Sequence, residues 1–270
     1  MKISGLKNLI KEYHIFYLTA ALLLVILKLL YRKADSDDLQ WLLAPTARWV
    51  QTLSGKPFEY LSRIGYVNHE LRFVIARSCS GFQFMLICAA ALIFSFLHRI
   101  VPAGSPESEN NTGGSGLFTK LLCGFGWIAA GFGLSYIITI LVNTVRILLS
   151  IDLPPLLERV SLGGWLTPDR LHTLIGTVVY FASLLMIYQA ADTLTLKLCA
   201  PHRPLPRIGS KAFFRFLQPA FWYFFFVLGI PVLTRAYRNG LSQFADYAIL
   251  VTLAGSVLLA LFTLAGNLRR

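Results

Sequence analysis

The chain has 270 residues, of which 56% are hydrophobic and only 14% are charged, and its mean hydropathy is +0.61. This composition excludes an ordinary soluble domain. The formal net charge of +12 could indicate a nucleic-acid ligand, but in so apolar a chain the expected partner of the basic residues is the membrane surface, and we expect no nucleic acid.

Apolar runs long enough to cross about 30 Å of hydrocarbon recur along the chain. Alternating strands of a membrane barrel would be shorter and half polar, so the sequence predicts an all-α, polytopic integral membrane helical bundle with about six or more transmembrane helices. The first run carries Lys28 and no small-residue cleavage site follows it, so we expect it to be retained rather than removed as a signal peptide. The runs are Tyr13–Leu30, Gly81–Leu97, Leu117–Val142, Leu171–Ala191, Phe213–Leu233 and Ala245–Leu264.

We expect one membrane domain over residues 1–270, in which three parts follow the first span. Residues 31–80 form an outer loop, residues 81–191 form the core of catalytic spans, and residues 192–270 form a C-terminal helical pair. The last two spans carry no convergent polar triad, which leaves packing or the docking of a substrate helix as their expected role.

Within the outer loop, Leu39–Leu53 mixes tryptophan and leucine with arginine and is too short to span, so it predicts an interfacial helix. Tyr60–Ala76 alternates apolar and polar residues in part and predicts a short β-hairpin. Val101–Gly116 and Pro201–Pro206 are rich in proline, and the first also in glycine and serine, as expected of connecting loops.

The four cysteines are Cys79, Cys88, Cys123 and Cys199. Two of them fall inside apolar runs and their spacing shows no disulfide framework. No Cys/His spacing typical of structural zinc occurs, so we expect neither a metal nor a cofactor.

Cys79 is the first candidate for chemistry. It lies in the segment Ser78-Cys79-Ser80-Gly81, directly before an apolar run. At the start of a helix the unpaired N–H groups and the helix dipole favour a thiolate, which is the nucleophilic form of cysteine. The alternative is that Cys79 is a small buried apolar residue.

Asn143 and Arg146 follow the third run, three residues apart on one helix face. An amide and a guanidinium on one face can point together at a developing oxyanion. The alternative for Arg146 is an arginine that extends its charge to the membrane interface.

His172 opens the fourth run, and Gly176 lies one helical turn later on the same face. Histidine suits proton transfer to and from a thiol and a leaving amine, although an interfacial, hydrated histidine is an equal alternative. Gly176 allows close approach of another helix, which is also ordinary membrane packing. We expect the other histidines, at positions 14, 69, 98 and 202, to be structural or solvated.

Alternation of the spans brings Cys79, Arg146 and His172 to one membrane face, because they lie at the start of one span, the end of the next and the start of the third. Basic residues before the first and fifth spans and at the C-terminus fall on the opposite face, which the positive-inside rule makes cytoplasmic. By raw count the basic residues on the two faces are close to tied. By the positive-inside rule we expect the three candidates on the outer face of the cell membrane. That they share one face follows from the alternation of the spans and does not depend on this rule.

Together these motifs resemble the exosortase/archaeosortase family of membrane cysteine transpeptidases. The resemblance covers Ser78 to about Tyr188 and consists of the Cys-Ser-Gly motif, Asn-x-x-Arg-Ile, and His-x-x-x-Gly in this order, with Leu43-Ala44-Pro45 in the outer loop. Many relatives have an acidic residue shortly before the cysteine, where this chain has Arg77-Ser78.

The resemblance implies that Cys79 is the nucleophile, Arg146 the substrate-polarising cation and His172 the general acid/base, supported by Ser80, Gly81, Asn143 and Gly176. It implies substrates that are exported proteins with a C-terminal sorting signal of the PEP-CTERM kind: a short motif such as Pro-Glu-Pro, a transmembrane helix and a basic tail.

Two other functions fit the residues. In a non-enzymatic transporter or assembly subunit, Arg146 would bind an anion or a lipid headgroup. The scarcity of ionisable residues near the middle of the spans argues against a transporter. A membrane thiol acyltransferase would use the same cysteine for a lipid acyl group.

Overall fold

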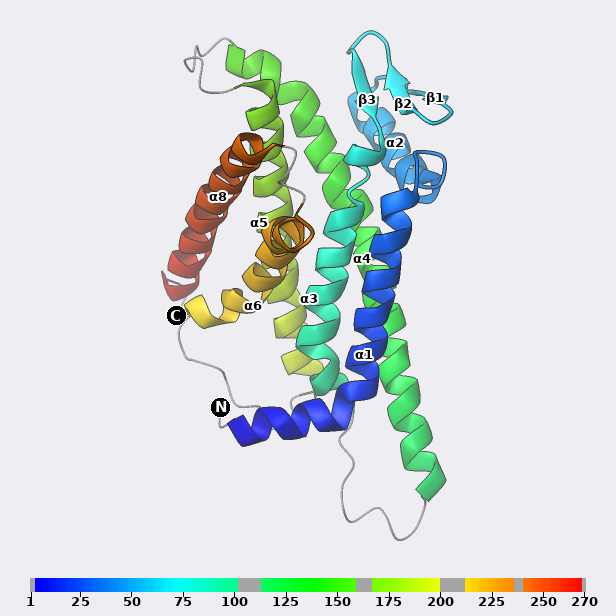
Figure 1. Cartoon of the computed structure of the whole chain (residues 1–270), viewed down its shortest axis with the longest axis vertical. Coiled ribbons are helices and arrows are strands. Elements are labelled where there is room, and N and C mark those ends of the chain that lie inside the picture. The colour runs from blue at the N-terminus through cyan, green and yellow to red at the C-terminus, as the bar shows by residue number, and fades with distance from the viewer. Residues whose placement is uncertain (1–2, 102–112, 159–166, 200–211, 236–239, 269–270) are drawn as a thin grey trace.

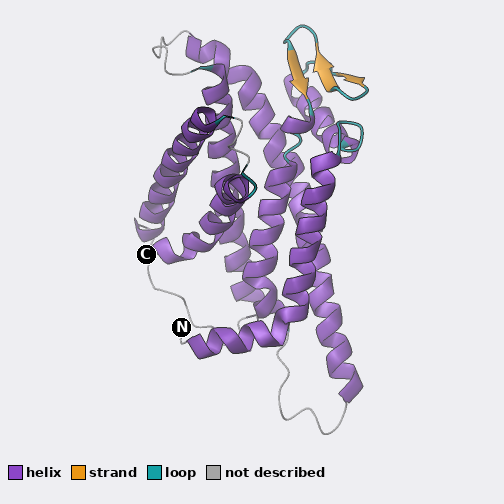
Figure 2. Ribbon diagram, in the orientation of Figure 1, coloured by secondary structure: helices purple, strands orange, loops and turns teal. Residues whose placement is uncertain are grey.

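The computed structural model describes residues 3–101, 113–158, 167–199, 212–235 and 240–268. In this part of the chain, 6 helices are long and apolar enough to cross a membrane. The protein is therefore an all-α, multi-pass membrane bundle, as predicted, with a small sheet at one end (Figure 1, Figure 2). We call this the sheet end of the bundle and the other the opposite end.

The helices follow the predicted order. The first two are α1 (Ile3–Lys33) and the short α2 (Gln40–Ser54), and the strands β1 (Glu59–Leu61), β2 (Gly65–Asn68) and β3 (Phe73–Ile75) follow. A 3₁₀ turn, η1 (Arg77–Cys79), leads into α3 (Phe82–Ile100), α4 (Gly113–Glu158) and α5 (Pro168–Cys199). The C-terminal helices are α6 (Ala212–Phe224), a π-helical segment η3 (Phe225–Gly229), α7 (Ile230–Leu233) and α8 (Leu241–Leu268).

Helix α3 is the centre of the bundle. In its most apolar window 89% of the residues are buried, against 17–33% in the other five spans. It packs most extensively on α4, where Gly131 approaches α3 so closely that an added Cβ would lie 2.7 Å from Cγ1 of Ile93. Small residues at such a contact let two helices pack tightly in a membrane.

Helix α4 is longer than its apolar run. Its 46 residues correspond to about 69 Å of helix, which exceeds the roughly 30 Å of hydrocarbon. The prediction that Asn143 and Arg146 end the third span is therefore wrong, because the helix continues past them to Glu158. Polar residues end an apolar run, but they do not end a helix.

Two other boundaries differ from the prediction. Helix α5 continues to Cys199, so residues 192–199 continue the helix that contains the fourth span. Helix α4 begins at Gly113, inside the loop predicted over Val101–Gly116. Residues 102–112 of that loop and the whole connector Pro201–Pro206 lie outside the described residues.

The segment between α1 and α3 folds as a cap on the sheet end. Helix α2 confirms the predicted helix and packs on α4, where the Tyr136 hydroxyl donates to the backbone oxygen of Trp41 at 2.9 Å. The predicted hairpin is a three-stranded antiparallel sheet, with Tyr60 opposite Tyr66 and Tyr66 opposite Ile75. The additional strand has only three residues, too few to give an alternating pattern.

Asp37 fixes this sheet to the end of α1. Its carboxylate accepts hydrogen bonds from the hydroxyls of Tyr60 and Ser62 and from the backbone N–H of Arg63. Hydrogen bonds to the charged form, first of all from Tyr60, lower the pKa of Asp37 from its ordinary value of 3.8, and the same contact raises the pKa of Tyr60.

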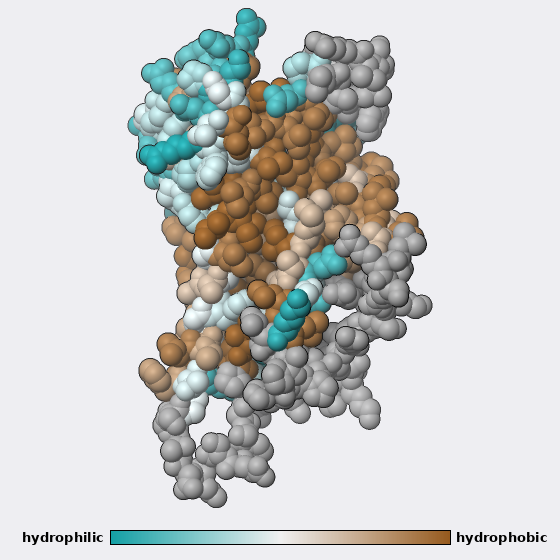
Figure 3. Space-filling model, turned by 180° about the vertical axis from the view of Figure 1, so that it is seen from behind, coloured by the Kyte–Doolittle hydropathy of each residue, from teal (hydrophilic) through white to brown (hydrophobic). Residues whose placement is uncertain are grey.

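The surface agrees with a membrane setting. Hydrophobic residues form a broad band across the middle of the molecule, and hydrophilic residues gather at the sheet end (Figure 3). Large apolar side chains of α1 and α8, such as Leu18 and Leu253, are 66% and 62% exposed. Lipid tails are the surroundings in which such exposure is stable.

Candidate active site

The turn that carries Cys79 is fixed to the end of α1. The Arg77 guanidinium donates to the backbone oxygens of Tyr31 at 2.7 Å and Arg32 at 3.3 Å, and it lies over the Tyr31 ring. The backbone N–H of Cys79 donates to Ala76 at 2.8 Å, which closes the 3₁₀ turn. Arg77 therefore caps the C-terminal end of α1.

Cys79 itself is almost buried, with 8% of its surface exposed. It precedes α3, as predicted, but it lies in η1 and not in the α-helix. The Ser78 hydroxyl lies 4.0 Å from the Cys79 sulfur. Ser80 is buried, and its hydroxyl accepts the backbone N–H of Phe82 at 3.3 Å, so it satisfies one of the unpaired N–H groups at the start of α3.

Asn143 connects the cysteine turn to α4. Its side-chain amide donates to the Cys79 backbone oxygen at 2.6 Å. Gly81 makes this contact possible, because its φ is +73° and an added Cβ would lie 3.0 Å from both Cγ of Asn143 and Cγ2 of Thr139. A side chain at Gly81 would be strained by the left-handed backbone and would push α4 away.

Arg146 lies one turn beyond Asn143 on the same helix and is 6% exposed. Its Nη1 donates to the Tyr180 hydroxyl at 3.3 Å, and its Nη2 lies 2.6 Å from Nε2 of His172. Arginine has only donors, so Nε2 of His172 is the acceptor and the imidazole proton is on Nδ1. Within the described residues Arg146 forms no ion pair.

Tyr180 completes the cluster, and the sequence analysis missed it. Its hydroxyl donates to Oδ1 of Asn143 at 2.7 Å, and its ring stacks on Phe84 with centroids 4.7 Å apart. The signal available in the sequence was its position on α5, where His172, Gly176 and Tyr180 repeat every four residues on one face.

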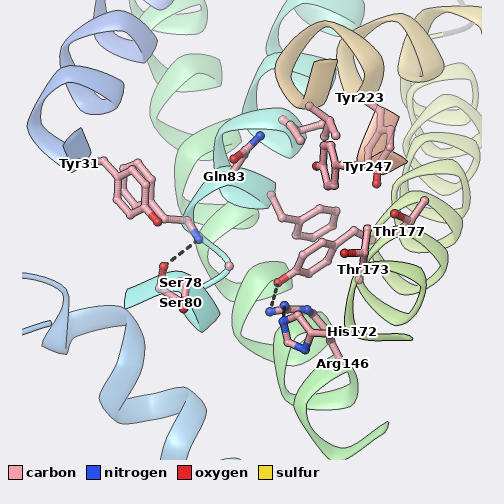
Figure 4. Close-up of a pocket in the computed structure, with 17 residues that line it drawn as sticks. Tyr31, Ser78, Ser80, Gln83, Arg146, His172, Thr173, Thr177, Tyr223 and Tyr247 are labelled. Atoms are coloured by element: carbon pink, nitrogen blue, oxygen red, sulfur yellow. Dashed lines mark hydrogen bonds between the residues drawn. The ribbon is translucent and has the colours of Figure 1, made fainter. Parts of the chain in front are cut away.

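A cavity of about 300 Å³ opens beside this cluster (Figure 4). Predicted site residues that line it are Ser80, Gly81, Arg146, His172 and Gly176. Cys79 and Asn143 are not among the described residues that line it, although Ser78 and Ser80, on either side of Cys79, are. Alternation of the spans predicted that Cys79, Arg146 and His172 share one side, and the structure does bring together the turn before α3, the second half of α4 and the start of α5.

The last two spans also line the cavity, which the expectation of simple packing did not include. They contribute Tyr223, Val227 and Tyr247. The Gln83 amide of α3 donates to the backbone oxygen of Phe226 at 3.1 Å, within the π-helical segment. A π-helical turn widens a helix locally and frees a backbone carbonyl for such a bond.

In Figure 4 the walls are seen to differ in chemistry. Ser78, Ser80 and Tyr31 lie on one side, Arg146 and His172 lie together below, and Thr173, Thr177, Tyr223 and Tyr247 lie opposite the serines. Hydroxyls thus surround one cation and one imidazole. Of the described residues, no three His, Cys, Asp or Glu side chains gather as a metal site would require.

The remaining histidines of the described chain lie away from this cluster. His14 is in α1, His98 is near the end of α3, and His69 is in the turn between β2 and β3. Position 202 is outside the described residues. None of the three described ones lines the cavity.

Compared with protein-family models, with curated proteins and with solved structures, the chain shows no match in any of the three.

Proposed function

We propose that the chain is a membrane-embedded cysteine peptidase or transpeptidase of the exosortase kind, which cleaves the C-terminal sorting signal of exported proteins. The observation that carries the proposal is the state of Arg146. A buried guanidinium with two neutral partners, a tyrosine hydroxyl and an imidazole, keeps its charge for a ligand. Its neighbours include a cysteine whose backbone is bound to the same helix.

The proposed reaction begins with the thiol. The Cys79 thiol gives its proton to Nε2 of His172, and the thiolate attacks the scissile carbonyl carbon. The guanidinium of Arg146 donates hydrogen bonds to the oxygen that becomes negative. His172 then protonates the departing amine, and the carbon–nitrogen bond breaks. The resulting thioester passes its acyl group to water or to an amine.

His172 must be released before it can accept a proton. At rest its Nε2 lone pair is occupied by Arg146 at 2.6 Å. A substrate carbonyl oxygen competes for the same guanidinium nitrogens, so substrate binding frees Nε2 at the moment when a base is required. Arg146 and His172 therefore act as one unit.

The membrane setting supports a substrate that is itself anchored. A transmembrane segment of the substrate diffuses in the same plane and presents its flanking peptide at the depth of the cavity, so the encounter is already oriented. By the distribution of basic residues, we propose that the sheet end faces outward from the cell membrane.

The test is processing of a co-expressed exported protein that ends in a short motif, a transmembrane helix and a basic tail. We expect Cys79→Ala to abolish cleavage with normal membrane insertion, and Cys79→Ser to be nearly as inactive because an alkoxide is hard to form near neutral pH. Cys88→Ala is the matched control, because Cys88 is a fully buried thiol of the neighbouring helix α3. Normal cleavage by Cys79→Ala would refute the thiol mechanism.

A further inference from the structure

We propose that Tyr180 is a positioning residue that fixes the Arg146 guanidinium relative to the turn that carries Cys79. This inference rests on the proposed function and adds a residue to it. The Tyr180 hydroxyl links Arg146 to Asn143, because it accepts a hydrogen bond from Arg146 at 3.3 Å and donates one to Asn143 at 2.7 Å. Asn143 in turn binds the Cys79 backbone oxygen at 2.6 Å.

The hydroxyl serves this role because it is neutral. A carboxylate in its place would also hold the guanidinium, but it would neutralise the charge that a developing oxyanion needs. A phenol hydroxyl orients Arg146 and leaves the charge available. Its ring adds a second restraint, since the guanidinium carbon lies 5.3 Å from the ring centroid.

The ring is fixed by its own contact. Tyr180 and Phe84 are stacked with planes 10° apart, so α5 is braced against the first turn of α3. Helix α5 therefore presents His172 and Tyr180 to two nitrogens of the same guanidinium. Nε of Arg146 is buried without a hydrogen-bond partner, so within the described structure these two side-chain hydrogen bonds and the Tyr180 ring orient its polar end.

The test is Tyr180→Phe, which keeps the ring and removes only the hydroxyl. Variants are made in a chain in which Cys79 is the sole cysteine. At saturating substrate we expect the cleavage rate to fall about 10- to 100-fold, as for loss of a hydrogen bond to a charged group, with KM changed less than threefold.

Tyr188→Phe is the matched control. Tyr188 lies two turns further along α5, and its hydroxyl bonds Gln218 at 3.0 Å, away from the cavity. Its cleavage rate is expected to stay within threefold of the parent chain. In an Asn143→Ala chain, Tyr180→Phe is expected to cost less than threefold more, because the link to Cys79 is already broken.

A second measurement separates positioning from folding. Iodoacetamide alkylates Cys79 by displacement of iodide at a saturated carbon, so no oxyanion forms and Arg146 is not needed as a donor. We expect Tyr180→Phe to be alkylated at the parent rate, within threefold. A parallel fall in alkylation and cleavage would show that Tyr180 merely supports the fold and would overturn the inference.

Cleavage by Tyr180→Phe at a rate within threefold of the parent chain would also overturn the role of Tyr180. In that case the proposed function would still hold, provided that cleavage depends on Cys79. If the parent chain shows no Cys79-dependent cleavage, the proposed function fails and the role of Tyr180 in it fails as well.

Discussion

Two arginines lie at the two ends of the bundle, Arg99 partly buried and Arg146 buried, and they are held in opposite ways. At the opposite end, Nη1 of Arg99 lies 2.6 Å from a carboxylate oxygen of Asp192 and 3.4 Å from the Thr195 hydroxyl. At the sheet end, Arg146 is held by Tyr180 and His172. Each guanidinium also lies over an aromatic ring.

The difference lies in charge compensation. Arg99 and Asp192 form a partly buried ion pair that neutralises both charges and joins α3 to α5. Arg146 has neutral partners, so the cost of burying its charge is not offset within the described structure. Uncompensated burial of this kind is typical of functional sites, because a ligand supplies the missing negative charge.

The largest expected effect is on chemical labelling, because the two ends of the bundle should lie on opposite sides of the membrane. Lys56, beside the sheet, and Lys197, near the end of α5, are both exposed. In a background without the native cysteines, Lys56→Cys should react with an impermeant maleimide added to intact cells, and Lys197→Cys should react only after lysis. Labelling of both from outside would contradict the alternation of the spans.

The next effect compares the arginines directly. We expect Arg146→Lys to lower the cleavage rate by about 10²–10³-fold, because lysine is a compact, hydrated charge and cannot contact an oxyanion and Tyr180 together. Arg99→Lys is the matched control and should stay within threefold, since an ammonium can still pair with Asp192. Cleavage by Arg146→Lys within threefold of wild type would reduce Arg146 to an interface anchor.

The ion pair predicts an effect on stability instead. Asp192→Asn leaves the Arg99 charge uncompensated and should lower the free energy of unfolding by about 3 kcal/mol. Protein that remains folded should cleave its substrate at the wild-type rate. Thermal unfolding in detergent, followed by activity at a temperature well below the transition, measures both. A selective loss of activity would place the ion pair in the catalytic machinery.

The smallest effect concerns the anchor of the sheet. Because hydrogen bonds lower the pKa of Asp37, its stabilising contribution is present above the ordinary carboxyl value of 3.8 and is lost as pH falls through the lower, folded-state value. Hydrogen-exchange protection of residues 59–68 should therefore persist to pH 4 and decrease only below it. Asp37→Asn should show lower protection that does not decrease further below pH 4. Glu59→Gln, at an exposed position of β1, should behave as wild type.

Sequence patterns predicted the spans and the shared side of the three candidates because both depend on properties local to a run. Hydrophobicity marks each span, and alternation of direction needs only their order. The tyrosines were not predictable in this way. Within an apolar run Tyr180 is indistinguishable from a packing residue, and only the register of α5 against α4 places its hydroxyl between Asn143 and Arg146.

The same limit applies to the cavity wall and to the length of α4. Tyr223 and Tyr247 come from different helices, and their approach to His172 depends on tertiary packing. Residues after Arg146 continue the helix because leucine and isoleucine are well tolerated there, although Pro154 and Pro155 suggest a boundary. An apolar run indicates which residues lie in the membrane, but it does not indicate where the helix ends.

The central claim is that Cys79 carries a peptide acyl group during the reaction, and mass spectrometry of the trapped enzyme tests it most directly. Wild-type protein is denatured in acid shortly after mixing with its tailed substrate, and the peptide containing Cys79 is analysed. The account predicts a thioester whose mass equals the substrate portion N-terminal to the cleaved bond, absent from Cys79→Ala. A fatty acyl group on Cys79 would indicate a lipid acyltransferase, and cleavage with no adduct in any trapped sample would contradict covalent catalysis by this thiol.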